Sequence, residues 1–261
     1  MNSVPLARIK NVLNTKRMDF KPYLQEIGFK DGSIPSFDHY PFNIPAIKNM
    51  PVIKFHADVT FIVGENGSGK STFIESLAQY LGISRAGGSR HSYIEERDDA
   101  SLSSHFRSSK SYRKPSDYFF LRAESLYNFA TYLDEIGETA KNYGIDSLHE
   151  CSHGESFLAV MANRLGGNGL YLFDEPEAAL SPTRQLTALS LIDNLVKKNS
   201  QFIIATHSPI LLAYPNAKIY QFDENGIRAV KYEDTDPYII TKSFLNNHES
   251  MIHNLLKSEE G

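Results

Sequence analysis

The feature that most constrains the fold is a glycine-rich segment, GENGSGKST at 64–72, which fits the pattern G-x-x-x-x-G-K-[ST]. It follows a run at 52–63 that becomes continuously apolar, and it precedes a segment at 71–81 whose apolar residues recur at helical spacing. Glycines let such a loop wrap with its N–H groups pointing inward, and the helix that follows adds its positive end. The motif therefore predicts a strand–loop–helix unit that binds phosphate groups.

Two residues of this loop have side chains with a direct chemical use. The amine of Lys70 reaches the β- and γ-phosphates of a bound nucleotide, and the hydroxyl of Ser71 is a ligand for Mg²⁺. A glycine-rich turn that fits by chance is the alternative, which the flanking strand and helix make much weaker. The expected nucleotide-binding residues of the loop are Gly64, Glu65, Asn66, Gly67, Ser68, Gly69, Lys70, Ser71 and Thr72.

A second apolar run, GLYLFD at 169–174, ends in two acids, Asp174 and Glu175. In a parallel sheet such a strand end lies beside the phosphate-binding loop. Asp174 would then hold Mg²⁺, and Glu175 would act as the general base that polarises the water attacking the γ-phosphorus. Two exposed acids at the start of a loop are the alternative, which the nearby phosphate loop disfavours.

Composition places the 261-residue, 29.4 kDa chain among ordinary globular proteins, because 41% of its residues are hydrophobic and 22% are charged. A net charge of −4 argues against a surface that coats nucleic acid throughout. The single cysteine, Cys151, excludes an internal disulfide framework and a four-cysteine zinc site. Apolar runs are too short to span a membrane, and residues 1–20 lack the apolar core of a secretory signal. We therefore expect a cytoplasmic protein.

The remaining pattern is of alternating strands and helices, with short strands and turns over 1–50. Strands are expected at 117–122 and 201–206, helices at 123–143, 182–196 and 241–257, and a hairpin at 217–232 with an Asn-Gly turn. Residues 84–116 differ, because they hold ten serines and no sustained apolar period. They are interpreted as a solvated loop, or alternatively as a phosphate-contacting patch built on Arg107, Lys110, Arg113 and Lys114.

Further motifs stand in a compact order around the acidic strand end. CSHGE at 151–155 resembles the LSGGQ signature of ABC-type ATPases, PEAALS at 176–181 resembles their D-loop, and ATHS at 205–208 resembles their H-loop. Together with the phosphate loop these motifs cover roughly residues 50–215. The finer resemblance, carried by FLRAES at 119–124, CSHGESF and LFDEPEAALSP, is to small stand-alone bacterial ATPases with DEPE. That branch is close to SMC-like and RecF-like ATPases and to the ATPase halves of overcoming-lysogenization-defect nucleases.

This resemblance implies a fold and an activity. The expected fold class is α/β, a P-loop NTPase of the ABC ATPase head type, with a mostly parallel central sheet, an N-terminal antiparallel β part and a helical insertion. Residues 1–261 would form one domain, within which 84–165 would be a helical subdomain carrying the signature. The implied activity is Mg²⁺-dependent hydrolysis of ATP.

The resemblance also implies a head-to-tail homodimer that forms when ATP binds. Ser152 and the backbone of Gly154 would contact the γ-phosphate held by the other copy, and His207 would contact it within the same chain. The signature residues expected at the nucleotide are Ser152, His153, Gly154 and Glu155. The expected catalytic residues are Glu175, His207 and Lys70, and the expected metal ligands are Ser71, Asp174 and Glu124, the last of which stands where the family has the Q-loop glutamine.

Several positions depart from the family pattern. His153 replaces the first glycine of the signature, Glu155 replaces its glutamine, and Ser181 stands where the D-loop has aspartate. Cys151 occupies the leucine position, where packing as a small hydrophobe is favoured over redox sensing. Tyr40 and Phe42 are candidates to stack on adenine, although core packing is the favoured interpretation for both.

Three functions follow from these features. The first is an ATPase that drives conformational change in a nucleic-acid-processing or defence system, with DNA, RNA or an effector protein as partner. The alternative is the nucleotide-binding subunit of an ABC transporter, which the altered Q-loop, D-loop and signature disfavour, so that a membrane partner is not expected. A small-molecule kinase is disfavoured further, because a kinase needs neither a signature-like motif nor a histidine after the following strand.

Overall fold

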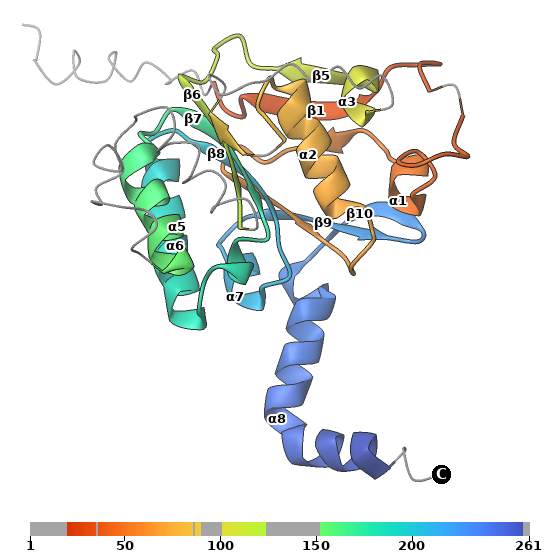
Figure 1. Ribbon diagram of the computed structural model, residues 1–261, viewed down its shortest axis with the longest axis vertical. Coiled ribbons are helices and arrows are strands. Elements are labelled where there is room, and N and C mark those ends of the chain that lie inside the picture. Colours follow the sequence, from red (N-terminus) through yellow and green to blue (C-terminus); the bar gives the residue numbers. More distant parts are fainter. Residues whose placement is uncertain (1–19, 35, 86, 90–100, 124–151, 258–261) are drawn as a thin grey trace, which may run out of the picture.

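The computed structural model describes residues 20–34, 36–85, 87–89, 101–123 and 152–257 (Figure 1). The strands are β1 (Leu24–Phe29), β2 (Ile53–Lys54), β3 (Val59–Val63), β4 (Gly88–Ser89), β5 (Phe106–Lys110), β6 (Asp117–Arg122), β7 (Gly169–Asp174), β8 (Gln201–Ala205), β9 (Lys218–Asp223) and β10 (Gly226–Val230). The α-helices are α1 (Pro45–Lys48), α2 (Lys70–Tyr80), α3 (Leu102–His105), α5 (His153–Ala159), α6 (Pro182–Lys197), α7 (Pro209–Leu212) and α8 (Asp236–Lys257). Shorter helical turns are η4 (Val160–Arg164), η5 (Pro176–Ala178) and η6 (Tyr232–Asp234).

The centre of the molecule is a seven-stranded sheet in the order β10-β9-β3-β8-β7-β6-β4. The strands from β9 to β6 all run parallel, whereas the edge strands β10 and β4 run antiparallel to their neighbours. The prediction of an α/β fold with a mostly parallel sheet is therefore confirmed. Because parallel strands end at one edge of a sheet, the loop after β3 and the acids after β7 emerge at the same edge, with β8 between them.

Both faces of this sheet are covered, so successive side chains of one strand enter different cores. Tyr171 and Phe173 of β7 pack in the core that α5 and α6 cover, while Leu170 and Leu172 pack in the core that α2 covers. All residues of β7 are buried. This double burial explains why the strand has a continuous apolar sequence instead of an alternating one.

A second sheet, in the order β2-β1-β5, is antiparallel and packs on α2. Leu24 and Ile27 of β1 and Phe106 of β5 are fully buried there, and the ring of Phe106 lies 6.0 Å from that of Phe73 on α2. The expected antiparallel part therefore exists, but its third strand comes from residues 106–110. The sheet fixes α2, and with it the loop that precedes this helix.

The interpretation of residues 84–116 as a solvated loop is wrong for 102–110, which form α3 and β5. The segment has few apolar residues, but Leu102 and Phe106 are both fully buried. Such isolated anchors carry no periodic signal, so the strand is recognisable only through its pairing with β1. Arg107, one of the four basic residues of this segment, pairs with Asp31 at 3.3 Å and remains half exposed.

Most of the other expected elements are confirmed within one or two residues. These are β6, β7, α6 and β8, together with the hairpin of β9 and β10. The turn of the hairpin is displaced by one residue from the expected Asn-Gly position, because Asp223 pairs with Gly226 and leaves Glu224 and Asn225 at the tip. The sequence explains where α6 begins. Ser181 accepts a hydrogen bond from the N–H of Arg184, and proline occupies the first turn.

Two expectations concern residues that the structure describes only in part. The helix expected at 123–143 lies outside the described residues beyond Ala123. The helical subdomain expected at 84–165 stays a prediction, although β4 and β5, which fall within it, belong to the two sheets.

The helix expected at 241–257 begins earlier, at Asp236, and bends at Asn247, where φ is −137°. It projects away from the body of the molecule (Figure 1). Within the described ranges, no helix has the length and apolar character needed to cross a bilayer.

Candidate active site

The glycine-rich loop connects β3 to α2 at the carboxyl edge of the main sheet. Gly64 has a φ of 154° and lies so close to β9 that a Cβ atom would stand 2.3 Å from the carbonyl oxygen of Phe222. Gly69 has a φ of 97°, and a Cβ atom there would stand 2.9 Å from the side chain of Ile44. The loop can therefore adopt this path only with glycine at these two positions.

Lys70 is the first residue of α2, and its side chain turns back over the loop. Its Nζ atom donates a hydrogen bond to the carbonyl oxygen of Glu65 at 2.9 Å. Burial lowers the pKa of Lys70, while the nearby carboxylates, of which Glu175 has the largest effect, raise it. The amine is thus held at the mouth of the loop among acids instead of in open solvent.

Two side-chain polar atoms in the described part of the chain are buried without a hydrogen-bond partner, namely Ser68 Oγ and His207 Nε2. A buried polar atom without a partner costs about 1–3 kcal/mol. Ser68 belongs to the phosphate loop, and His207 follows β8 at the same edge of the sheet. Both atoms are therefore available to a ligand with oxygen acceptors, such as a phosphate group.

Asp174 ends β7, and only 2% of its surface is exposed. Its Oδ1 atom lies 3.3 Å from Ser71 Oγ, the hydroxyl expected at Mg²⁺. Burial raises the pKa of Asp174 to about 7, an effect that the Arg122 guanidinium opposes. A buried carboxylate beside a hydroxyl is the donor set that Mg²⁺ takes in proteins, so these two residues fit the expected ion.

Glu175 has an unusual backbone conformation, with φ at 47° and ψ at 52°. Its N–H donates to the carbonyl oxygen of Ala205 at 2.9 Å, which holds this turn against the end of β8. A residue other than glycine in this region costs of order 1–3 kcal/mol and persists only where its surroundings impose it. Its side chain is about one third exposed and lines the same cavity as Lys70 and Ser71.

His207 lies beside this carboxylate, with its Nε2 atom 3.8 Å from Glu175 Oε1. Burial and then the charge of Lys70 lower the pKa of His207, so the imidazole is neutral at pH 7. Glu177, the last residue of the DEPE sequence, accepts hydrogen bonds from the N–H of His207 and from Thr206 Oγ1, contacts that the sequence did not predict. Glu177 therefore anchors the turn that presents His207.

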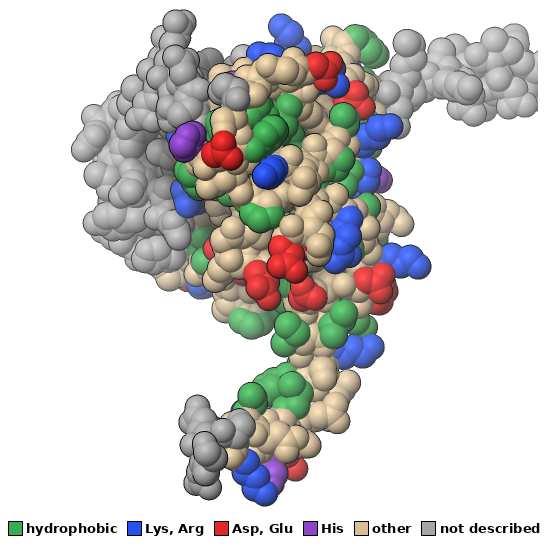
Figure 2. Space-filling model, turned by 90° about the vertical axis from the view of Figure 1, so that its right-hand side faces the viewer, with side chains coloured by type: hydrophobic (Ala, Val, Ile, Leu, Met, Phe, Trp, Pro, Cys, Tyr) green, Lys and Arg blue, Asp and Glu red, His purple; other side chains and the backbone are tan. Residues whose placement is uncertain are grey.

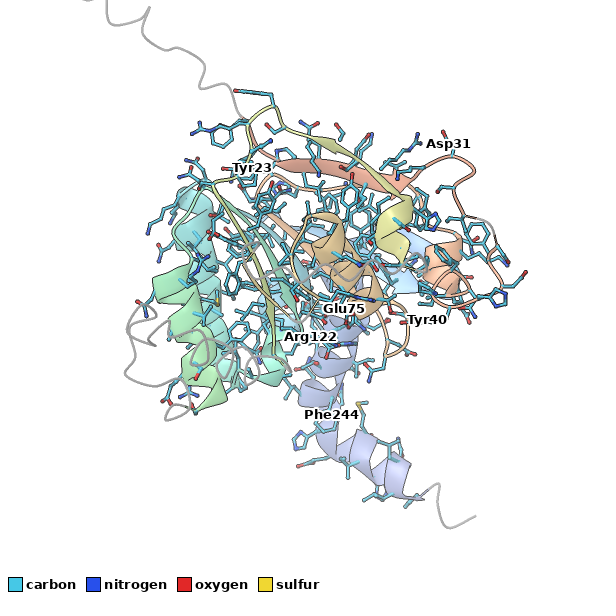
Figure 3. All side chains as sticks on the ribbon, turned by 45° about the horizontal axis from the view of Figure 1, so that its top comes forward. Tyr23, Asp31, Tyr40, Glu75, Arg122 and Phe244 are labelled. Carbon is cyan, nitrogen blue, oxygen red and sulfur yellow. The ribbon has the colours of Figure 1, made fainter. Side chains whose placement is uncertain are left out.

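Arg122 also makes contacts that the sequence did not predict. It ends β6 directly beside Asp174 in the parallel register, and its Nε atom lies 3.5 Å from Asp174 Oδ2. Its Nη1 atom lies 2.7 Å from Glu75 Oε1 on α2, and Figure 3 shows Arg122 and Glu75 close together. The FLRAES motif contains this arginine, but only the register of β6 and β7 reveals its partners.

The turn that resembles an ABC signature begins α5. Ser152 and Glu155 form a capping box, in which Ser152 Oγ accepts from the N–H of Glu155 and the Glu155 carboxylate accepts from the N–H of Ser152. Glutamate at 155 thus satisfies the free N–H at the helix start. Because glutamine closes the same capping box, what the glutamate adds is an ion pair with Arg184 of α6.

Arg184 of α6 ties this turn to the rest of the domain. It donates to Ser152 Oγ and to Glu155 Oε1, both at 2.9 Å. Gly154 is packed so closely that a Cβ atom would stand 2.6 Å from Arg184 Nη1 and 2.8 Å from the carbonyl oxygen of Ala179. The expectations for three further residues stay predictions. Glu124, Cys151 and the side chain of His153 lie outside the part of the chain that the structure describes.

An aromatic residue stands at the open side of the phosphate loop. Tyr40 is 68% exposed, its hydroxyl lies 3.2 Å from Thr72 Oγ1, and it lines a cavity of about 570 Å³ with Lys70 and Ser71 (Figure 3). Core packing, the favoured interpretation for both aromatic candidates, is therefore wrong for Tyr40 and correct for Phe42, which is buried. Tyr40 is the candidate for stacking on a nucleotide base that the geometry supports.

The raised pKa of Asp174 predicts how stability depends on pH. Because the folded protein binds a proton at Asp174 more tightly than the unfolded chain does, the metal-free protein should lose stability as pH rises from about 4 to about 7. The substitution Asp174→Asn should remove this contribution, so that the variant gains stability relative to wild type over the range. Denaturant midpoints measured in EDTA at a series of pH values test this.

The matched control is Asp31→Asn, which makes the same substitution at a carboxylate that is 89% exposed. A constant difference in stability between wild type and Asp174→Asn across the range would contradict the burial-raised pKa.

Comparison with known proteins finds two family models that match parts of this chain. A model described as "AAA domain" matches residues 42–145, and a model described as "AAA domain, putative AbiEii toxin, Type IV TA system" matches residues 147–213. Between them, the two matches span the chain from 42 to 213 apart from residue 146. This region contains the phosphate loop, the acidic strand end, the signature-like turn and His207.

Two relatives illustrate the range of curated proteins that the chain resembles. A "Putative ABC transporter ATP-binding protein" of Bacillus thuringiensis is 27% identical over 81% of this chain and 42% of its own length. The cell division ATP-binding protein FtsE of Streptococcus pneumoniae is 25% identical over 76% of this chain and 93% of its own length. The chain thus spans less than half the length of the Bacillus relative.

Among solved structures, CbiO1 of Clostridium perfringens, part of an ABC transporter complex, has 18% identity over 79% of this chain and 90% of its own, with a TM-score of 0.46. The SMC head domain of Thermotoga maritima has 16% identity over 80% and 98%, with a TM-score of 0.41. The AAA-domain matches, the ATP-binding relatives and the strand–loop–helix unit around Lys70 together make this chain similar to the ABC-type ATPases of the P-loop fold.

Proposed function

We propose that this chain binds ATP with Mg²⁺ at the carboxyl edge of its main sheet and hydrolyses the terminal phosphate bond with Glu175 as general base. The observation that carries the proposal is the convergence of Lys70, Glu175 and His207 from three different strand ends onto one site. Because Ser68 Oγ and His207 Nε2 are both buried there without partners, the site is arranged for an anionic ligand.

Each residue of the site has its own role in this proposal. Lys70 would exchange the carbonyl oxygen of Glu65 for the β- and γ-phosphates, and Ser71 and Asp174 would hold the ion. Mg²⁺ supplies neutralisation of phosphate charge when it is bound. Glu175 accepts the proton of the attacking water, and neutral His207 offers Nε2 to the γ-phosphate. Glu124 remains a proposed further ligand.

The site needs a second copy of the chain to include the signature residues. Ser152 caps α5 and Gly154 lies in its first turn, and this helix packs with α6 on one face of the sheet, whereas α2 covers the opposite face. We infer a head-to-tail homodimer in which Ser152, Gly154 and the start of α5 from one copy reach the γ-phosphate held by the other. His153 and Glu155 accompany them in this turn.

Two alternative systems are proposed for this ATPase. The DEPE sequence and the altered signature support a nucleic-acid or effector partner in the cytoplasm. The printed names of the Bacillus relative, an ABC transporter ATP-binding protein, and of FtsE support the alternative of a transporter subunit. Activity measurements separate the two functions. A transporter subunit needs a membrane partner for full ATPase activity, whereas the first function predicts that nucleic acid or an effector protein stimulates this activity.

Glu175→Gln tests the catalytic proposal. The amide keeps the shape of the side chain but cannot accept the water proton, so hydrolysis should fall by about 10²–10⁴-fold while ATP affinity is retained. The nucleotide-bound dimer should accumulate, as measured by light scattering on gel filtration with ATP and Mg²⁺. Glu224→Gln, at the exposed tip of the β9–β10 hairpin, is the matched control. A variant that stays monomeric with ATP would overturn the composite site.

Lys70→Ala tests the phosphate loop. Removal of the amine leaves the β- and γ-phosphates without their principal cation, and we expect a loss of at least about tenfold in ATP affinity, measured by calorimetry or with a fluorescent analogue. Lys218→Ala removes an exposed lysine that bonds the carbonyl oxygen of Lys54 instead, and serves as the control. Wild-type affinity in Lys70→Ala would refute the assignment of the loop.

The basic segment that includes β5 gives a test of nucleic-acid binding. Arg107 is half exposed, and replacing it together with Lys114 by glutamine should reduce the slope of log affinity against log salt by about 1–2 for DNA or RNA. Fluorescence anisotropy over a salt series measures this slope. Arg228→Gln, which replaces an exposed arginine on β10, an edge strand of the main sheet, is the control. An unchanged slope would remove this segment from any nucleic-acid site.

A further inference from the structure

The C-terminal helix α8 is exposed along nearly its whole length. From Ile239 to Lys257 every residue is exposed except Met251, which is half-buried. Its first turn is attached to the body, where Asp236 accepts a hydrogen bond from Gln221 and the ring of Tyr238 lies 4.7 Å from that of Tyr232. Figure 1 shows the rest of α8 as an arm that leaves the body and bends.

The arm is apolar as well as exposed. Of the eleven exposed large hydrophobic side chains in the described residues, seven lie on α8. They are Ile239, Ile240, Phe244, Leu245, Ile252, Leu255 and Leu256. Figure 2 shows hydrophobic side chains on the arm below the body.

These side chains have the spacing of a helix that packs against another helix. From His248 onward, Met251, Ile252, Leu255 and Leu256 follow at positions i+3, i+4, i+7 and i+8, which is one continuous stripe. His253, Asn254 and Lys257 fall on the opposite side of the same helix. An isolated helix of this length is only marginally stable in water, and most helical stability in proteins comes from packing such a stripe. The stripe on α8 therefore calls for a partner surface.

The area and charge of the arm fit a second copy of this chain. The seven exposed apolar side chains of the whole arm, including the four before the bend at Asn247, expose on the order of 700 Å², and each partner contributes ~800 Å² to a stable interface. The charged side chains of α8 balance, since Asp236 and Glu249 match Lys242 and Lys257. Two copies of the helix can therefore approach without net repulsion, and a two-fold interface uses the same stripe twice.

The position of the arm also points to a second copy. Asp236, where α8 begins, lines a cavity of about 540 Å³ together with Glu65, Asn66 and Ser68 of the phosphate loop. The arm thus starts at the edge of the face that the ATP-bound dimer would bury, a step that rests on the proposed function. We propose that α8 is a dimerisation arm, which packs its apolar stripe against α8 of a second copy and holds the two copies together without nucleotide.

The test is the oligomeric state of the nucleotide-free chain. Light scattering and sedimentation velocity should show wild type as a dimer at about 20 µM without ATP. The substitutions Ile252→Asp and Leu256→Asp, made together, place two charges in the stripe and should weaken the dimer by at least about tenfold. The matched control, His253→Asp with Asn254→Asp, adds the same charges on the opposite side of the helix and should remain dimeric.

Further measurements check that the substitutions in the stripe act on the dimer and not on the rest of the protein. Binding of a fluorescent ATP analogue should be unchanged in the stripe variant, because the substitutions lie on the arm and away from the phosphate loop. A deletion of residues 248–257 should give the same monomer. A wild type that is monomeric at about 100 µM would overturn the proposal, as would a stripe variant that stays dimeric or a control that dissociates equally. Monomeric wild type that binds lipid vesicles through the stripe would equally overturn it.

Failure of this proposal is distinguishable from failure of the proposed function. Lys70→Ala should still dimerise without nucleotide, because its arm is intact. If Glu175→Gln dimerises with ATP while the nucleotide-free chain is monomeric, the arm proposal alone fails. If the nucleotide-free chain is dimeric through the stripe but ATP has no effect on Glu175→Gln, the composite site alone fails.

Discussion

The burial of one carboxylate at the end of β7 organises the whole site. Asp174 is almost inaccessible, and removing a charged group from water is expensive unless it is paired. Ser71 from α2 and Arg122 from β6 both approach its oxygens, and Arg122 also reaches Glu75 on α2. Compensation of this single charge therefore connects two strands with the helix that begins at the phosphate loop. These contacts therefore help to set the distance between the phosphate loop and the acidic end of β7.

Local patterns were sufficient to predict the parts of the site that come from one segment each. The strand–loop–helix unit, the acidic end of β7 and the helix α6 depend on turn chemistry and apolar spacing, which a single sequence displays. The Arg122–Asp174 and Arg184–Ser152 contacts depend on strand register and helix packing, which it does not. The strand β5 was missed for a similar reason, because its burial rests mainly on Phe106 and on pairing with β1.

The signature-like turn illustrates how one residue can satisfy local and distant requirements together. Glu155 closes the capping box of α5 and also binds Arg184, so the turn is rigid before any ligand arrives. Gly154 leaves room for the same guanidinium. A helix start fixed in this way presents its N–H groups in one direction at little further entropic cost, which favours binding of an anion held by another surface.

The left-handed backbone at Glu175 has a consequence for how this protein tolerates change. Glycine at this position would relieve the strain, and the fold would gain stability at the expense of the carboxylate. Selection for stability alone would therefore remove the residue, whereas the role of general base proposed for its carboxylate requires it. The same conflict arises wherever a reactive group occupies a conformation that its own backbone disfavours. At position 175, the residue that would make the fold most stable and the residue that the proposed chemistry requires are therefore different.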